Sequence, residues 1–166
     1  MSKERVLFIV RHAKSSWEIE NISDVDRPLK LRGIRDAYEM ARRMKINRIY
    51  PQHFISSPAN RALHTANIFM TIFEADYSHF HIDPRLYGQG KKAILQVIRS
   101  QPSSIGNLII FGHNPDFSEV VREFASQSFF ELPTCGVAIF KFNSDTWEGI
   151  AKENLKSENF DYPKKE

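Results

Sequence analysis

Compact apolar runs recur along the chain, separated by polar stretches and by segments with helical periodicity. A short continuous apolar run is typical of a strand buried on both faces of a sheet. Residues 6–10 and 108–111 form the clearest runs. The residues of 136–142 instead alternate, with Val137, Ile139 and Lys141 on one side. Strands are predicted at 6–10, 54–56, 80–83, 108–111 and 136–142.

Between these runs, apolar residues spaced three or four positions apart predict amphipathic helices. Helices are predicted at about 31–45, 58–73, 91–100 and 115–124. Two of them begin at a capping residue followed by proline, Ser57-Pro58 and Asn114-Pro115. The polar stretch 11–28 is predicted as a loop, and the tail from Lys156 as a loose polar segment.

This succession of strands and helices predicts an α/β fold with a mostly parallel central sheet. The length of 166 residues fits one domain, which we expect to span 1–166. The composition, 42% hydrophobic and 26% charged, is typical of a globular protein. The formal net charge of +3 is too small to indicate a nucleic-acid-binding protein.

The compartment is indicated by the apolar runs and by cysteine usage. No run approaches the roughly 20 apolar residues of a membrane helix, and the amino-terminal apolar stretch is too short for a signal peptide. Cys135 is the only cysteine, so no intrachain disulfide can form. A free cysteine suits a reducing compartment. We therefore expect a cytoplasmic protein with neither a membrane nor a nucleic-acid partner.

Unusual residues follow three of the predicted strands. Arg11 and His12 come directly after the first strand, Arg61 lies shortly after the second, and His113 follows the strand at 108–111. Because the carboxyl ends of parallel strands meet at one edge of a sheet, these side chains are expected to converge on one pocket.

Two arginines and two histidines in one pocket suit phosphoryl transfer. The guanidinium fork matches phosphate oxygens, and neutral imidazole is a nucleophile near pH 7 because its ordinary pKa is about 6.5. A second imidazole can donate a hydrogen bond to the phosphoryl oxygens. Such a pocket positions the phosphoryl group and neutralises its charge without magnesium, so no metal or cofactor is expected. Ser15 either donates to the phosphate or merely caps the loop.

Five ordered motifs between positions 11 and 138 carry a family resemblance. They are Arg11-His12-Ala13-Lys14-Ser15-Ser16-Trp17, Asp26-Arg27-Pro28-Leu29 with Arg32-Gly33, Ser56-Ser57-Pro58 with Arg61-Ala62 and Thr65-Ala66, Leu86-Tyr87, and Gly112-His113-Asn114-Pro115; Thr134-Cys135-Gly136-Val137-Ala138 also fits. By these motifs the sequence resembles the histidine phosphatase superfamily, which has a phosphoglycerate mutase-like fold, and within it the small SixA-type phosphohistidine phosphatases.

The resemblance implies a three-layer α/β/α sandwich. It also implies that His12 is the phosphorylated nucleophile and that Arg11, Arg61 and His113 bind the phosphoryl group. The sequence departs from the phosphoglycerate mutase branch, in which a glutamate acts as general acid after the second arginine. The comparable stretch 82–87 contains no glutamate, and Asp83 is a weak substitute.

The absence of a glutamate as general acid affects which substrate we expect. An alcohol leaving group, with a pKa comparable to the 15.7 of water, needs a proton as it departs, whereas the ordinary pKa of imidazole is only about 6.5. We therefore expect a phosphatase that acts on phosphohistidine of a protein. The alternatives are a phosphatase for small phosphate esters and a non-catalytic phosphate-binding module.

Several other residues leave two interpretations open. Trp17 either forms a wall of the pocket or packs within its loop. The basic stretch from Arg27 to Arg48 either docks an acidic partner or is the solvated face of a helix, and the second is favoured. Asp26 and Arg27 are expected to anchor the loop. The remaining histidines lack metal-ligand spacing and are predicted at the surface; they are His53, His64, His79 and His81.

Overall fold

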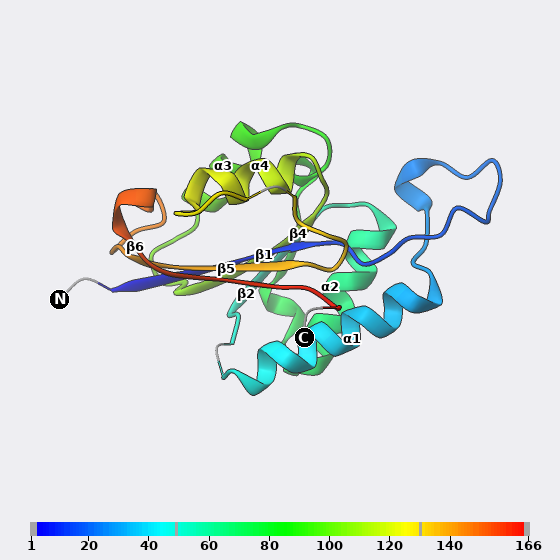
Figure 1. Cartoon of the computed structure of the whole chain (residues 1–166), viewed down its shortest axis with the longest axis horizontal. Helices are drawn as coiled ribbons and strands as arrows, with labels where there is room; N and C mark the ends of the chain where they lie inside the picture. Colours follow the sequence, from blue (N-terminus) through cyan, green and yellow to red (C-terminus); the bar gives the residue numbers. More distant parts are fainter. Residues whose placement is uncertain (1–2, 49, 130, 165–166) are drawn as a thin grey trace.

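Six strands form one mixed sheet in the order β3-β2-β4-β1-β5-β6 in the computed structural model, which describes residues 3–48, 50–129 and 131–164 (Figure 1). The strands are β1 (Glu4–Arg11), β2 (His53–Ser56), β3 (Phe80–Ile82), β4 (Asn107–Gly112), β5 (Val137–Asn143) and β6 (Leu155–Asp161). Neighbouring strands among β3, β2, β4 and β1 pair in parallel, whereas β5 is antiparallel to both β1 and β6. The predicted α/β fold is therefore confirmed.

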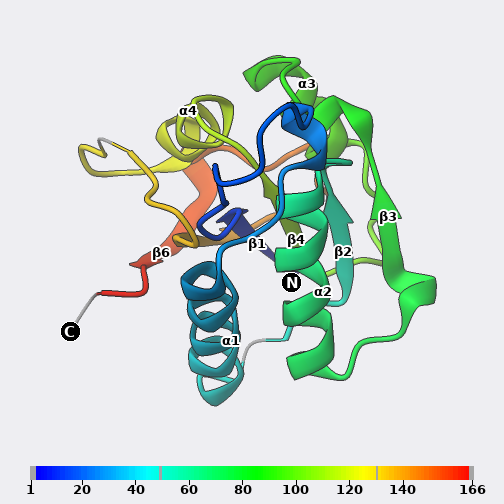
Figure 2. The same ribbon diagram turned by 90° about the vertical axis from the view of Figure 1, so that its right-hand side faces the viewer.

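Helices cover both faces of this sheet, with α1 and α2 on one side and α3 and α4 on the other (Figure 2). They are α1 (Leu31–Ile46), α2 (Asn60–Phe73), α3 (Lys91–Arg99) and α4 (Asp116–Phe124). Short 3-10 turns lie at η1 (Asp24–Asp26), η2 (Tyr77–His79), η3 (Pro84–Leu86) and η4 (Lys152–Asn154). None of the described helices is both long and apolar enough to cross a membrane.

The apolar run of β1 serves two hydrophobic cores at once. Leu7 and Ile9 are fully buried beneath α3 and α4, while Phe8 and Val10 are fully buried beneath α1 and α2. Burying one such side chain contributes about 1.5–3 kcal/mol. The two faces explain why this strand is continuously apolar rather than alternating. They also hold its carboxyl end, where Arg11 and His12 follow, in a fixed position.

Both helices predicted to begin at a cap-plus-proline pair begin later. The N-cap of α2 is Ala59, so the helix starts two residues past Pro58. Ser57 Oγ accepts a hydrogen bond from the Ala59 amide, but it also contacts His113, so its hydroxyl serves the site as well as the turn. The N-cap of α4 is Pro115, and Asn114 instead accepts from the Ser118 amide of the first turn.

The expectation of a loose tail from Lys156 is wrong. Residues Leu155–Asp161 form β6, which pairs with β5 along its length. Phe160 anchors the strand, with its ring centroid 5.0 Å from that of Phe129 and 5.9 Å from that of Phe140. Leu155 and Phe160 both pack against the hydrophobic core, and backbone pairing with β5 holds the rest of the strand, whose other residues are polar. On β5 the more buried face also differs from the predicted one, since Phe140 and Phe142 are fully buried.

Candidate active site

The predicted site residues meet at the carboxyl edge of β1, β2 and β4. Arg11 is the last residue of β1 and lies in register with Gly112 of β4. The His12 amide donates to the Gly112 carbonyl over 2.9 Å, which fixes the chain just beyond the strand. The ring centroids of His12 and His113 are 5.2 Å apart. Arg61 reaches the same place from the first turn of α2.

A cavity of about 240 Å³ opens at this edge. Its lining comprises Arg11, His12, Lys14, Ser15, Trp17, Arg27, Arg61 and Thr134. The structure thus brings Arg11, His12, Ser15 and Arg61 together, with the ring of His113 beside that of His12. Four of the lining side chains are cationic, so the cavity suits an anion.

The imidazole of His12, the expected nucleophile, is held in its neutral form. Its Nδ1 lies 2.7 Å from the Ala13 carbonyl oxygen, which can only accept, so Nδ1 carries the proton and Nε2 keeps its lone pair. Burial lowers the pKa of His12 to about 4; the Ala13 hydrogen bond opposes this, and the charges of Arg61 and Arg11 lower the pKa further. The side chain is therefore uncharged at neutral pH, with Nε2 as the atom that can attack phosphorus.

His113 is also neutral and is oriented by Ser57. Its Nε2 lies 2.7 Å from Ser57 Oγ, and its ring packs edge-on against Tyr87 at a centroid distance of 5.2 Å. Burial, followed by the nearby His12 and Arg61, lowers the pKa of His113 to about 3. Its Nδ1 is buried and has no hydrogen-bond partner among the described residues. A buried nitrogen without a partner can form a hydrogen bond with a polar ligand.

The two arginines expected to bind phosphate are fixed differently. Arg61 Nη1 donates to the Asp24 carbonyl over 2.7 Å, and Arg61 Nη2 donates to Asp24 Oδ2 over 3.0 Å. Arg11 Nη1 donates to the Leu132 carbonyl over 3.0 Å and lies 3.7 Å from the Glu131 carboxylate. Each guanidinium has five N–H donors, so both retain donors for phosphoryl oxygens.

Asp24 contacts the candidate site although the sequence did not predict this. Besides Arg61, its carboxylate accepts from Tyr87 Oη over 2.6 Å and from Arg27 Nη1 over 3.0 Å. These partners, the Tyr87 hydrogen bond foremost, hold the pKa of Asp24 far below its usual range. It is therefore a permanent anion that ties the loop after β1 to the site. The only signal in the sequence was an acid three residues before Arg27 in a polar loop.

Arg27 anchors the loop as expected, but through Asp24 rather than Asp26, whose carboxylate accepts from Ser23 Oγ. It also contacts the cavity directly. Arg27 Nη2 donates to Ser15 Oγ, and the guanidinium stacks 3.2 Å from the ring centroid of Trp17. Trp17 is 75% exposed and lines the cavity, which supports the pocket-wall interpretation. Ser15 lines the cavity while it is also bonded within the loop.

Asp83 does not reach the cavity lining. Its carboxylate accepts from the Arg85 amide over 3.0 Å and from Arg85 Nη2 over 2.7 Å. This pairing with Arg85 lowers the pKa of Asp83, so the group stays ionised. An ionised carboxylate outside the cavity is poorly placed to supply a proton to a leaving group.

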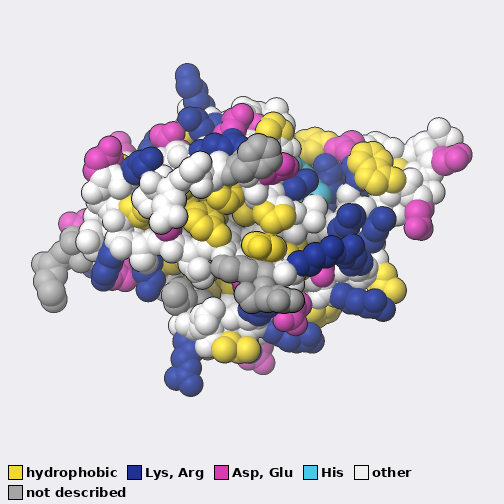
Figure 3. All heavy atoms as spheres, in the orientation of Figure 1, with side chains coloured by type: hydrophobic (Ala, Val, Ile, Leu, Met, Phe, Trp, Pro, Cys, Tyr) yellow, Lys and Arg dark blue, Asp and Glu magenta, His cyan; other side chains and the backbone are white. Residues whose placement is uncertain are grey.

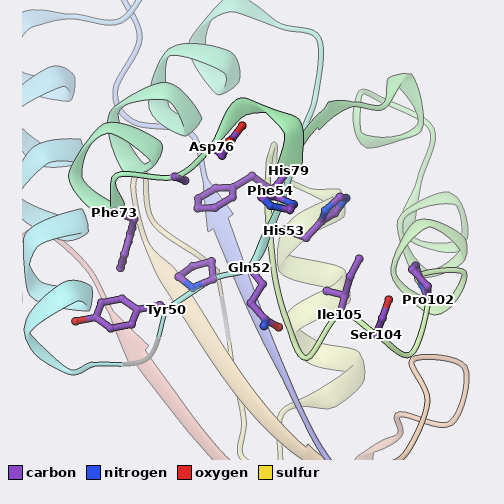
Figure 4. A pocket seen from close by; sticks show the side chains of 12 residues that line it. Tyr50, Gln52, His53, Phe54, Phe73, Asp76, His79, Pro102, Ser104 and Ile105 are labelled. Carbon is purple, nitrogen blue, oxygen red and sulfur yellow. The ribbon is translucent and has the colours of Figure 1, made fainter.

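A second, larger cavity of about 540 Å³ lies at the opposite end of β2 (Figure 4). His53 and His79 line it, and the His53 ring is 4.7 Å from that of His81. His79, His81 and His64 are exposed as predicted, whereas His53 is half-buried. Within the described part of the chain, no three histidine, cysteine, aspartate or glutamate side chains are grouped so that they could hold a metal ion.

Comparisons with known proteins agree with this geometry. A chloroplastic protein of Arabidopsis thaliana that is itself uncharacterized is 28% identical over 155 residues, covering 89% of this chain and 71% of its own. A candidate phosphohistidine phosphatase SixA from Nakamurella multipartitia has a similar structure, with a TM-score of 0.82, 19% identity and 99% of each chain covered.

The structure of the protein histidine phosphatase SixA in complex with tungstate is also similar, with a TM-score of 0.74 and 20% identity over 95% of this chain and 97% of that one. At this level of identity, both structural likenesses concern the fold. The model of the histidine phosphatase superfamily (branch 1) matches residues 7–87, which include Arg11, His12 and Arg61. Residues 7–87 of the chain therefore match the histidine phosphatase superfamily, and this match, together with the fold, supports an enzyme of the phosphatase class.

Proposed function

We propose that this phosphatase removes the phosphoryl group from phosphohistidine on a protein and carries it transiently on His12. The observation that supports this most directly is the state of His12, which is neutral, with Nδ1 bonded to Ala13 and Nε2 free. Its neighbours Arg11 and Arg61 can bind the phosphoryl oxygens. The similarity in fold to a SixA in complex with tungstate, a tetrahedral oxyanion like phosphate, adds support.

The reaction has two displacements at phosphorus. In the first, His12 Nε2 forms a bond to phosphorus while the bond from phosphorus to the substrate imidazole nitrogen breaks. In the second, a bond forms from a water oxygen to phosphorus while the bond from phosphorus to His12 Nε2 breaks. One proton of the water passes to solvent, and inorganic phosphate leaves with His12 restored. The Ala13 carbonyl accepts a hydrogen bond from the Nδ1–H group throughout and so stabilises positive charge on the phosphorylated ring. The oxygens of the transferred group carry negative charge. This charge would be stabilised during the transfer by Arg11, Arg61 and His113.

The preference for phosphohistidine over an ester is supported by the surroundings of Asp83. Among the described residues, no carboxylic acid that could protonate a leaving oxygen lines the cavity, and Asp83 is paired with Arg85. A leaving imidazole can take its proton from solvent because its ordinary pKa is about 6.5. A phosphatase for small, activated esters is the second candidate. The expected cytoplasmic location stays a prediction.

The phosphoenzyme provides the test. A protein phosphorylated on histidine is mixed with excess enzyme and quenched in alkali, and acid-labile phosphate on the enzyme is measured. We expect label on the native enzyme and none on His12→Ala. The matched control is His64→Ala, because His64 is an exposed histidine on α2. Equal labelling of His12→Ala would mean that another residue is the nucleophile. Turnover of aryl phosphate but not of the phosphoprotein would favour the ester alternative.

A further inference from the structure

A second hollow adjoins the active-site cavity and shares Lys14 and Thr134 with it. Its volume is about 350 Å³. Three cationic side chains and one carboxylate line it, namely Lys14, Arg32, Lys164 and Asp36. The lining is therefore net positive. We call this hollow the basic groove.

The first wall of the basic groove is fixed against α1. The Lys14 carbonyl accepts a hydrogen bond from the Lys30 amide over 2.9 Å. Gly33, in the first turn of α1, lies so close that any side chain at this position would collide with the Lys14 backbone. Lys14 is thus held at the boundary between the active-site cavity and the groove.

The opposite wall is equally fixed, although it lies near the end of the chain. Arg43 of α1 donates to the carbonyls of Tyr162 and Pro163 over 3.0 and 2.9 Å, and to Asp161 Oδ1 over 3.2 Å. Tyr162 and Pro163 line the groove beside Lys164. The groove is therefore a preformed surface with apolar as well as cationic walls.

The cations of the basic groove have no partner within the described part of the chain. Among the described residues, no hydrogen bond or ion pair engages the side chains of Lys14, Arg32 or Lys164, in contrast to the paired Arg27, Arg43 and Arg61. Figure 3 shows Lys and Arg side chains gathered beside a visible histidine, over the first turn of α1. Unpaired cations at the entrance of a catalytic pocket attract an anionic substrate.

The other side of the entrance carries exposed apolar side chains. Trp17, Ile19 and Leu31 are all exposed, and Ile19 and Leu31 line a further shallow hollow with Arg32. Exposed apolar residues grouped beside charged ones are typical of a surface that contacts another protein. The surroundings of the phosphoryl pocket therefore combine cationic with exposed apolar side chains.

We propose that the basic groove binds an acidic peptide segment that flanks the phosphohistidine of the substrate protein. This inference rests on the proposed function. An extended acidic segment fits better than the second phosphate of a small molecule, because the cations are exposed and come from three separate parts of the chain. A site for one small anion instead brings several buried donors together on it. The volume and the apolar walls also suit a peptide.

Two histidine peptides, phosphorylated chemically with phosphoramidate, test this proposal. One has aspartate and glutamate around the histidine, and the other has serine and asparagine. At low salt we expect kcat/KM to be about threefold to tenfold higher for the acidic peptide. The ratio of kcat/KM for the acidic peptide to kcat/KM for the serine and asparagine peptide should fall to about one in Arg32→Glu/Lys164→Glu. It should fall in the same way for the native enzyme at high salt. The control Lys92→Glu/Lys152→Glu has the same change in charge at exposed positions outside the groove lining, and should keep the ratio.

A binding measurement separates this inference from the proposed function. The acidic peptide, unphosphorylated and fluorescently labelled, should bind the native protein and the control variant, and several-fold more weakly the groove variant. If neither phosphopeptide is hydrolysed but this binding pattern holds, the proposed substrate is wrong and the groove assignment stands. Equal binding to all three proteins would overturn the groove assignment, as would a ratio near one in the native enzyme. Displacement of the peptide by inorganic pyrophosphate at equal concentration would point to a small second anion instead.

Discussion

The Asp24 carboxylate and the Arg61 guanidinium form an ion pair at 3.0 Å, and a second Arg61 N–H donates to the Asp24 carbonyl. The arginine expected to bind the phosphoryl group is thus already oriented by an anion of the loop after β1. Tyr87 and Arg27 hold that anion from two other directions. Asp24 therefore determines which of the Arg61 donors remain for the substrate.

We expect Asp24→Asn to lower kcat about tenfold and to change KM much less. The amide keeps the size of the side chain but loses the charge that orients Arg61, and displacement of a positioned donor is felt mainly in the transition state. Steady-state kinetics with an aryl phosphate give both constants. Tyr87→Phe removes one hydrogen bond to the same carboxylate and should show a smaller loss of kcat. An unchanged kcat in Asp24→Asn would show that Arg61 needs no such support.

Arg61→Lys should lose about 10²–10³ in kcat, the usual cost of removing one preorganised donor to the transition state. Lysine keeps the charge but has no planar fork, so it cannot both bond to Asp24 and bind phosphoryl oxygens. The matched control is Arg42→Lys, because Arg42 is an exposed arginine of α1. If Arg61→Lys turns over within a factor of three of the native rate, Arg61 does not contact the transferred phosphoryl group.

The two buried histidines predict a loss of stability in acid. The pKa of His12 is about 4 and that of His113 about 3 in the folded protein, against about 6.5 when unfolded. The unfolded chain therefore binds more protons below pH 6.5, so their contribution to stability is complete above that pH and is lost as pH falls toward 4. By pH 5 the loss should reach the order of 2 kcal/mol for each histidine.

Urea unfolding at pH 7 and pH 5 measures this loss. The double variant His12→Asn/His113→Asn should lose clearly less free energy of unfolding between the two pH values than the native protein. His64→Asn is the control, because His64 is an exposed residue of α2 outside the cavity lining, and this variant should lose as much free energy of unfolding as the native protein. If the native protein and the His12/His113 variant respond equally to pH, the two imidazoles are not held neutral by burial.

The meeting of Arg11, His12 and His113 could be predicted because it depends on a simple rule. Each residue directly follows an apolar run, and parallel strands present their carboxyl ends at one edge. The rule needs only the type and direction of the strands, both of which the pattern of apolar residues indicates. Arg61 follows the same logic through the loop that leads into α2.

The roles of Asp24 and Ser57 could not be predicted in this way. Asp24 lies in an irregular loop, whose path is set by contacts with residues such as Arg61 and Tyr87 that are distant in the chain. Ser57 had the pattern of a helix cap, and the pattern cannot show that its hydroxyl also contacts His113. β6 was missed because its pairing is made by the backbone and its side chains are mostly polar.

The last prediction concerns the leaving group. With Asp83 paired to Arg85 outside the cavity lining, a departing oxygen would leave without a proton, and negative charge would build on it. The value of kcat/KM for a series of aryl phosphates should therefore fall steeply as the pKa of the leaving phenol rises, because an effective general acid is what flattens such a slope. Alkyl phosphates should react far more slowly than phosphohistidine.

Asp83→Asn decides whether the acid is truly missing. The slope should be the same in this variant as in the native enzyme, since the carboxylate takes no part in proton transfer. Arg85→Gln is the companion variant, because it frees Asp83 from its ion pair and should also leave the slope unchanged. A shallow native slope that steepens in Asp83→Asn would identify Asp83 as the proton donor. It would also favour small phosphate esters over phosphohistidine as the substrate, since an ester gains far more from a proton donor than a phosphoramidate does.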